Sequence, residues 1–294
     1  MKQYLAVDIG GTSMKYAAVD DRGELRRLGT VPTGSRMTRS GLETALLQAA
    51  RTVQGPLDGV GISTLGTVDS AAGRVLGGVE NMPCLQDFCP AGLFAREWPG
   101  LPVNILNDVR AAALGERWRG AAQGKRDFLC VAFGTGVGGC VVLNGRPLEG
   151  AFHRAGEIGY WNYAGPEEYW ELQGSAVALI RRGAAALNCP DLDGRAFFAR
   201  LEEGDPVCEA LFADWLQKAG RVFANIQILL DLDTIVVGGG VSAQKERLTE
   251  PLRRAMEECL PPECRDRCRV VPALLGNDAA LLGSVCGLLG RKVG

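Results

Sequence analysis

Short apolar runs alternate along the chain with longer segments in which apolar residues recur at helical spacing. Runs of strand length lie at residues 5–9, 16–19, 60–63, 103–106, 234–237 and 269–271. Helical spacing extends over residues 41–53, 108–122, 167–186, 206–230 and 246–259. Strands that alternate with helices predict sheets covered by helices, so we expect an α/β fold. No linker rich in Pro and Ser interrupts the chain, and we therefore expect closely packed domains.

Two segments of the chain repeat one another. Residues 4–23 read YLAVDIGGTSMKYAAVDDRG and align with residues 128–147, which read FLCVAFGTGVGGCVVLNGRP. Both contain an apolar strand, a glycine turn, a second apolar strand and a polar turn. The match predicts two related halves that each open with a β-hairpin, although hairpins of this kind are common enough to match by chance.

The composition is that of a globular protein, with 47% hydrophobic and 22% charged residues among 294. A net charge of −2 with mixed signs provides neither a basic surface for nucleic acid nor a polybasic membrane signal. No apolar stretch approaches the roughly 20 residues that span a bilayer, and no signal peptide is evident. We therefore expect a cytoplasmic protein that binds neither nucleic acid nor membrane.

The ten cysteines of such a protein are expected to be reduced thiols. Three of them, Cys259, Cys264 and Cys268, lie close together in the sequence. A zinc site would need a fourth ligand and usually a tighter pair of cysteines. We interpret the three as cysteines of the surface or of helix ends.

Asp8 interrupts an apolar strand and is followed by a glycine turn. A dinucleotide-binding fingerprint or a P-loop would lead from the glycines into a helix, whereas residues 15–19 read as a strand. Glycines between strands still let backbone N–H groups approach a phosphate, and Thr12 adds a hydroxyl donor. The matched turns at 8–12 and 134–139 together predict a polyphosphate site, with Mg²⁺ between Asp8 and the phosphates.

The alternative for the first turn is a tight hairpin in which Asp8 only accepts hydrogen bonds. The repeat has Ala132 at the corresponding position, so the hairpin itself does not require the acid. A third glycine cluster, 238–240, follows the strand at 234–237, which is a common place for nucleotide contact in α/β sheets. Ser242 is expected to cap the next helix, and residues 276–278 form a similar but weaker case.

Carboxylates beside these turns are candidates for chemistry. Asn107 and Asp108 end a strand and begin a helix, whose dipole favours ionised Asp108 at a position suited to take a proton from a substrate hydroxyl. Plain capping of the helix is the alternative. Glu157 lies between glycines and can point into a cleft, where carboxylates recognise the hydroxyls of a sugar. His153, the only histidine, has no evident partner and is interpreted as structural.

The order of these motifs resembles the ROK family of sugar kinases and repressors. The likeness runs along nearly the whole chain and rests on DIGGT at 8–12, Asn107–Asp108, GTGVGG at 134–139, GEIG at 156–159 and VGGG at 237–240. It implies an actin-like (ribonuclease-H-like) α/β fold of two duplicated domains, with nucleotide and sugar in the cleft between them. We expect a first domain over residues 1–107, completed by a C-terminal helix at 278–294, and a second domain over 108–277.

The resemblance also implies residue roles. Asp108 would be the catalytic base that activates the sugar 6-hydroxyl for in-line attack on the γ-phosphate of Mg-ATP. The substrate-binding residues would be Gly66, Asn81, Asn107, Asp108, Glu157, Tyr160 and Glu171. The nucleotide-binding residues would be Asp8, Gly10, Gly11, Thr12, Lys15, Gly134, Thr135, Gly136, Gly138, Gly239 and Gly240. Asp8 would hold Mg²⁺, directly or through water.

Two departures from the family pattern matter. Tyr160 stands where the family usually has a zinc-binding histidine, and the accompanying cysteine cluster is missing. We therefore predict no structural zinc, and a loop held instead by the packing of Trp161, Tyr163, Tyr169 and Trp170. Because that histidine also contacts the sugar, Tyr160 leaves the substrate open. The chain also starts at its first strand, without the helix-turn-helix of ROK repressors, which favours a kinase.

The leading hypothesis is an ATP-dependent hexose kinase, with glucose as the first candidate, then N-acetylmannosamine or N-acetylglucosamine, then fructose or allose. A non-catalytic sugar sensor on the same fold is the alternative that Tyr160 motivates; the presence of Asp8 and Asp108 argues against it. A third hypothesis is an actin-like phosphotransferase or phosphatase that uses polyphosphate, against which Glu157 and Glu171 argue. The resemblance suggests a homodimer.

Overall fold

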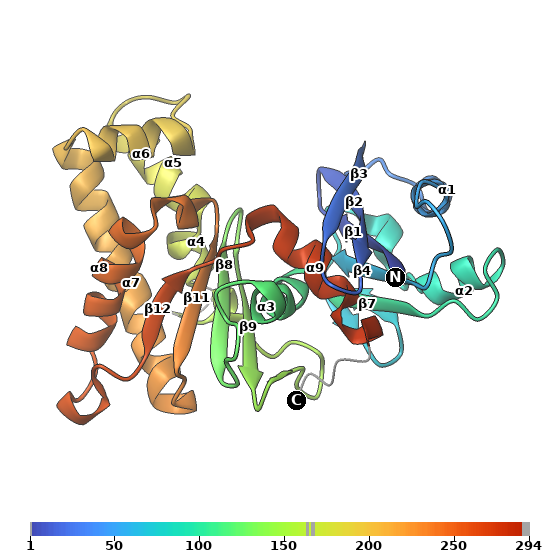
Figure 1. Ribbon diagram of the computed structural model, residues 1–294. Helices are drawn as coiled ribbons and strands as arrows, with labels where there is room; N and C mark the ends of the chain where they lie inside the picture. Colours follow the sequence, from blue (N-terminus) through green and yellow to red (C-terminus); the bar gives the residue numbers. More distant parts are fainter. Residues whose placement is uncertain (1, 163–164, 166–167, 290–294) are drawn as a thin grey trace. The chain divides into compact units, whose positions relative to one another are not determined.

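The computed structural model describes residues 2–162, 165 and 168–289. These residues form two compact units. The first unit contains residues 2–124, 144–155 and 275–289, and the second contains the described residues of 125–143 and 156–274. In Figure 1 each unit is a sheet flanked by helices. Among the described residues, no helix is both long and apolar enough to cross a membrane.

The first unit is built on a five-stranded sheet in the order β3-β2-β1-β4-β7. The strands are β1 (Gln3–Ile9), β2 (Ser13–Asp20), β3 (Leu25–Pro32), β4 (Gly59–Thr64) and β7 (Val103–Asn107). Neighbours among β1, β2 and β3 are antiparallel, whereas β4 lies parallel to both β1 and β7. The carboxyl ends of β1, β4 and β7 therefore meet at one edge of the sheet.

Helices cover both faces of this sheet because the side chains of a strand alternate between faces. Leu5 and Val7 of β1 belong to a core that includes residues of α1 (Arg39–Arg51). Tyr4 and Ala6 pack instead against residues of α9 (Ala279–Cys286). The remaining elements of the unit are β5 (Thr67–Asp69), β6 (Arg74–Gly77), α2 (Pro90–Ala95), β10 (Arg146–Pro147) and the 3₁₀ turns η1 (Pro83–Leu85), η5 (Gly276–Asp278) and η6 (Gly287–Leu289).

Helix α3 (Asp108–Arg119) crosses α9 at very short range within the first unit. A Cβ at Gly115 of α3 would overlap the carbonyl of Ala279, and one at Gly283 of α9 would overlap the carbonyl of Ala111. Because of this packing α3 belongs to the first unit. The chain passes between the two compact units after residues 124, 143, 155 and 274, whereas the expected boundary lies between 107 and 108.

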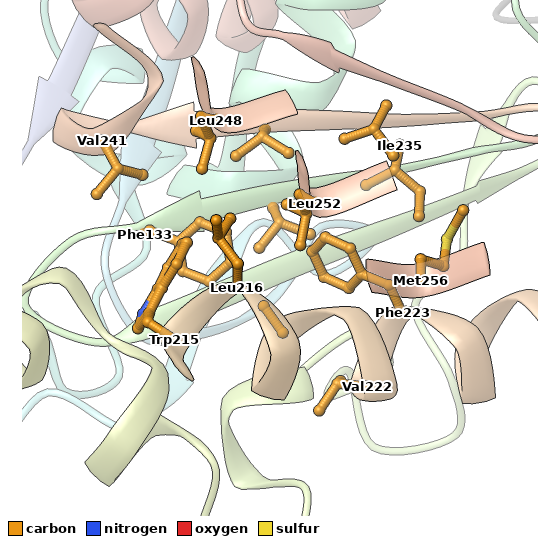
Figure 2. Close-up of a cluster of buried hydrophobic side chains, with 14 of the residues drawn as sticks. Phe133, Trp215, Leu216, Val222, Phe223, Ile235, Val241, Leu248, Leu252 and Met256 are labelled. Carbon is orange, nitrogen blue, oxygen red and sulfur yellow. The ribbon is translucent and has the colours of Figure 1, made fainter. Parts of the chain in front are cut away.

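The main strands of the second unit are ordered β9-β8-β11-β12. They are β8 (Phe128–Phe133), β9 (Val137–Leu143), β11 (Thr234–Gly239) and β12 (Arg269–Pro272). The helices and 3₁₀ turns are α4 (Glu171–Gly174), α5 (Ala176–Ala186), α6 (Gly194–Glu202), α7 (Pro206–Leu230), α8 (Glu246–Glu258), η2 (Ile158–Tyr160), η3 (Gly240–Gln244) and η4 (Pro262–Cys264). Figure 2 shows Trp215 and Phe223 of α7 and Leu252 of α8 packed with strand residues such as Phe133 and Ile235.

The predicted duplication is confirmed by the strand pairing. β1 forms an antiparallel hairpin with β2 and lies parallel to β4, just as β8 pairs with β9 and lies parallel to β11. One predicted element is wrong. The single helix expected at 167–186 is instead two helices, α4 and α5, because Ser175 is extended and its Oγ caps α5 by accepting the N–H of Ala178. Residue 167 lies outside the described residues.

Candidate active site

Asp8 is the penultimate residue of β1 in the first unit, just before the glycine turn. Lys15 of β2 and Ser63 of β4 lie directly opposite it in the sheet register. The Ser63 hydroxyl, which is fully buried, donates a hydrogen bond of 2.9 Å to Asp8 Oδ1. Burial raises the pKa of the Asp8 carboxyl, while the Ser63 hydrogen bond and the charge of Lys15 act in the opposite direction. A carboxylate kept in such an environment is typical of functional sites.

The turn after Asp8 is anchored on one side and open on the other. Thr33 donates from its hydroxyl to the Gly10 carbonyl (2.6 Å) and from its backbone N–H to the Thr12 carbonyl (3.0 Å). No atom lies within 4 Å of the position that a Cβ would take at Gly11, and Gly11 and Thr12 are exposed. A ligand can therefore approach the backbone of this turn.

Asp108 is the first residue of α3, at the carboxyl edge of the same sheet. The side chain of Asn107 caps the helix by accepting the N–H groups of Val109 (3.0 Å) and Arg110 (3.2 Å). Asn107 therefore provides the helix cap. Asp108 Oδ1 also accepts the N–H of Val109, at 2.9 Å. The helix dipole favours the ionised form of a carboxylate at this end.

The segment expected to bind sugar is joined to the start of α3. Asn107 Nδ2 donates to the carbonyl of Gly66, which precedes β5 (3.1 Å). The structure therefore brings together three of the predicted residues, Gly66, Asn107 and Asp108. Asn81 lies in an exposed turn between β6 and η1.

In the second unit, Glu171 contacts the turn of the repeated hairpin. Its Oε2 accepts the backbone N–H of Val137 at 3.0 Å. A Cβ at Gly136 would overlap this carboxylate, so a larger residue there would have to displace the Glu171 side chain. At Gly134 and Gly240, in contrast, no atom lies within 4 Å of the place that a Cβ would take, which leaves their backbones open to a ligand. Glu171, which the family resemblance implies as a sugar ligand, thus also supports the turn that carries Gly134 and Thr135 and leads into β9 with Gly138.

Glu157 and the strand end at 239 lie beside the same hairpin. Gly156, which precedes Glu157, passes close to β9, where a Cβ would lie 2.7 Å from the carbonyl oxygen of Gly139. Gly239 ends β11 next to Phe133 of β8. The expectation that Ser242 caps the following helix is wrong, because its hydroxyl instead donates to the Gly239 carbonyl at 2.8 Å and α8 begins only at Glu246.

The described residues of the loop before Glu171 pack largely through their aromatic rings. Trp170 is fully buried and meets the ring of Phe133 edge-on, with 5.7 Å between the ring centroids. Trp161 packs against the same core. Tyr160 is 57% exposed, and the centroid of its ring lies 5.5 Å from that of the Tyr169 ring. These contacts confirm the predicted packing of Trp161 and Trp170, and Tyr169 packs on Tyr160 at the surface.

The fourth aromatic residue of that prediction, Tyr163, lies outside the described residues. Within the described parts of the chain, no group of three or more His, Cys, Asp and Glu side chains is arranged to hold a metal. The absence of structural zinc stays a prediction.

Two residues that matter in the first unit were missed or undervalued from the sequence. His153 has partners after all, since its Nδ1 lies 3.2 Å from Glu149 Oε2 and its Nε2 lies 3.7 Å from Asp69 Oδ2. Arg110, which follows Asn107 and Asp108 on α3, is only 3% exposed. The available signal was an arginine among the small apolar residues of a helix face that is otherwise buried.

Comparison with known proteins identifies the family. The sequence matches the ROK family over residues 4–288. The chain belongs to the ROK family. It is 31% identical to a beta-glucoside kinase of Listeria monocytogenes, with 95% of each chain covered. It is 29% identical to a glucokinase of Halalkalibacterium halodurans, covering 95% of this chain and 93% of that protein.

The fold of this ROK protein is likewise shared with solved structures. A ROK family glucokinase from Streptomyces griseus, solved in complex with glucose and AMPPNP, superimposes with a TM-score of 0.80 at 29% identity, over 96% of this chain and 97% of that one. The protein thus has the actin-like fold of the ROK sugar kinases, as the sequence predicted.

Proposed function

We propose that this ROK protein is an ATP-dependent sugar kinase that phosphorylates a hexose or an N-acetylhexosamine at the 6-hydroxyl. The observation that carries the proposal is the start of α3. There Asn107 supplies the cap and holds Gly66, and Asp108 follows at the positive end of the helix dipole. The related glucokinases and beta-glucoside kinases are sugar kinases by name, which supports the same class of reaction.

In the proposed reaction Asp108 accepts the proton of the sugar 6-hydroxyl. The hydroxyl oxygen then attacks the γ-phosphorus, the bond to the β,γ-bridging oxygen breaks, and ADP and the sugar 6-phosphate are formed. Positioning of the hydroxyl supplies much of the rate in such a reaction. Glu157 and Glu171 accept hydrogen bonds from other sugar hydroxyls, with Glu171 also keeping its bond to Val137.

The polyphosphate is proposed to bind at the open glycine turns. The backbones at Gly11, Gly134 and Gly240 are accessible, and backbone N–H groups in such turns are ready donors to phosphate oxygens. The Asp8 carboxylate suits a Mg²⁺ ion because Mg²⁺ prefers oxygen ligands. Burial also disfavours the ionised carboxylate, and a bound cation would offset that cost. When bound, Mg²⁺ neutralises charge on the β- and γ-phosphates. Lys15, opposite Asp8, adds a further positive charge on this side of the sheet.

A coupled ADP-release assay tests the proposal. The panel contains glucose, N-acetylmannosamine, N-acetylglucosamine, fructose, allose and a β-glucoside, each with ATP or polyphosphate as donor. We expect turnover of at least one sugar with ATP, and a loss of about 10²–10⁴-fold in kcat for Asp108→Asn, the range for a general base. The matched control is Asp191→Asn, which changes an exposed carboxylate of the second unit. We expect it to leave kcat unchanged.

Turnover that survives in Asp108→Asn would contradict the role of this residue as the base. If no sugar is phosphorylated but one raises the melting temperature, the protein is a sugar sensor and the kinase proposal is wrong. Size-exclusion chromatography with light scattering tests the further proposal, made on the family resemblance, that the protein is a homodimer.

A further inference from the structure

Arg110 is a buried cation whose partners are backbone carbonyls. Its Nη1 donates to the carbonyl of Val68 at 3.4 Å, and its Nη2 donates to the carbonyls of Glu149 (3.4 Å) and His153 (2.8 Å). In the part of the chain that the structure describes, no carboxylate lies within ion-pair distance of it. Burying a guanidinium without a counter-charge is costly, so a simple packing role would be served better by an apolar side chain.

The carbonyls that Arg110 binds come from two segments distant in the sequence. Val68 is the middle residue of β5, which directly follows Gly66. Glu149 and His153 belong to the segment 149–154. This segment is part of the first unit, although the stretches before residue 144 and after residue 155 belong to the second. Arg110 itself lies two residues after Asp108. The planar guanidinium carries five donors and can serve both segments at once, which a lysine ammonium on a flexible stem does less well.

Every residue from Gly66 to Asp69 is held by a side chain from one of these elements. Asn107 Nδ2 binds the Gly66 carbonyl, and Arg154 Nε donates to Thr67 Oγ1 at 3.3 Å. Arg110 binds the Val68 carbonyl, and His153 Nε2 faces Asp69 Oδ2 at 3.7 Å. The start of α3 and the segment 149–154 thus hold β5 from two directions.

One residue of the segment 149–154 is held in an unfavourable backbone conformation. His153 has φ +57°, in the left-handed region that non-glycine residues seldom adopt. Both ring nitrogens face carboxylates, Glu149 and Asp69, and the His153 carbonyl makes the shortest of the three bonds to Arg110. Such a conformation persists where its surroundings constrain it on several sides, and it is found most often near functional sites.

We propose that Arg110 is a positioning residue of the sugar site. It joins the start of α3, β5 and the segment 149–154 into one fixed wall, and so holds Gly66 at a set place relative to Asn107 and Asp108. The inference rests on the proposed function in that these three residues are taken to face the sugar. A displacement of about 1 Å in such a wall lowers the rate by up to about 10²-fold, which gives Arg110 leverage without touching the substrate.

The test compares Arg110→Ala and Arg110→Lys with the wild type, in two independent readouts. Hydrogen–deuterium exchange needs no substrate. We expect Arg110→Ala to speed exchange in residues 67–69 and in 149–154 together, and Arg110→Lys to give an intermediate effect because it keeps a charge and some donors. In steady-state kinetics we expect kcat/KM for the sugar to fall by about 10–100-fold in Arg110→Ala, with a smaller fall in Arg110→Lys and no change in KM for ATP.

Leu252→Ala, at a buried position of the second unit, is the control for general destabilisation. It should lower the melting temperature without changing exchange in the two segments or KM for the sugar. If Arg110→Ala does not fold, Arg110→Lys carries both readouts alone. Unchanged exchange in either segment, or an unchanged sugar KM and kcat in a folded variant, would overturn the proposal. A wild type that phosphorylates no sugar would refute the proposed function instead, and the exchange experiment would still decide whether Arg110 holds the wall.

Discussion

Replacing Asp8 by asparagine separates a functional role of this carboxylate from a structural one. The residue lies next to the end of β1, its side chain is partly buried, and its Oδ1 accepts a hydrogen bond of 2.9 Å from the hydroxyl of the buried Ser63. Asparagine has nearly the same shape, and its carbonyl oxygen can accept the same hydrogen bond. The substitution therefore removes the negative charge and leaves the strand and its pairing in place.

The expected change in stability follows from the opposing influences on Asp8. Burial acts most strongly and disfavours the charged form, whereas Ser63 and Lys15 favour it. Exchanging a charged for a neutral acceptor weakens the Ser63 hydrogen bond by about 1 kcal/mol, while the larger cost of burying the charge disappears. We expect Asp8→Asn to raise the free energy of unfolding by about 1 kcal/mol, within the range of about 0.5–2 kcal/mol for such stabilising changes. The melting temperature then rises by about 2–4 °C.

The gain should depend on pH in a defined direction. The pKa of Asp8 in the folded protein is raised above 3.8, the ordinary value of an aspartate, which also applies to the unfolded chain. The contribution of this group to stability is therefore fully present below pH 3.8 and is lost as the pH rises through the folded pKa. The asparagine variant has no such loss. The stabilisation by Asp8→Asn is thus largest at neutral pH and disappears in acid.

Urea unfolding at neutral pH and near pH 4 measures the stability, and ADP release with the best sugar of the panel measures activity. We expect activity to fall by at least about 10²-fold, as for the loss of a preorganised electrostatic contact. Asp191→Asn serves again as the exposed control. A lower melting temperature of Asp8→Asn at neutral pH, a gain in stability that does not change with pH, or full activity would show that the reasoning about Asp8 is wrong.

Three further predictions concern packing, metal content and thiols. Gly61→Ala places a Cβ 2.5 Å from the Ser284 carbonyl oxygen, and should lower the free energy of unfolding by about 1–3 kcal/mol in urea unfolding. Gly92→Ala, with no atom within 4 Å of the new Cβ, is the matched control and should be neutral or stabilising. Metal analysis of protein purified without chelator should find no zinc, and about one zinc per chain would contradict the aromatic packing account of the loop. A thiol reagent at neutral pH should label exposed Cys259 but not Cys268, whose pKa burial raises to about 12; equal labelling by mass spectrometry would contradict this.

Local patterns predicted the parts of the fold that depend on neighbouring residues. The two hairpins could be recognised because an apolar strand, a glycine turn and a second strand require contacts only within about 20 residues. The start of α3 was equally evident, since Asn107 and Asp108 are a typical cap and first turn. The helix expected at 167–186 failed for a related reason: apolar spacing continues through Ser175, while the choice of that serine as a cap depends on its backbone conformation.

Contacts between distant segments were not predicted from the sequence. Glu171 was expected to face a sugar, and its contact with the N–H of Val137 could not be foreseen from spacing. His153 was interpreted as having no partner, yet it lies between Glu149 and Asp69. The local signal for Arg110, an arginine among small apolar residues of a helix, was weak, and its burial depends on the tertiary structure.

Periodicity, turn chemistry and the order of motifs were therefore enough to indicate an α/β chain with two related halves, a glycine-turn hairpin in each half and a carboxylate at a helix start. These features depend on hydrogen bonds and side-chain spacing along a single segment. Only the tertiary structure assigned α3 to the first unit and joined β5 to the segment 149–154 through Arg110. The reason is physical: a guanidinium donates to whatever carbonyls surround it, and the packing of α3 against α9 and β5 decides which carbonyls those are.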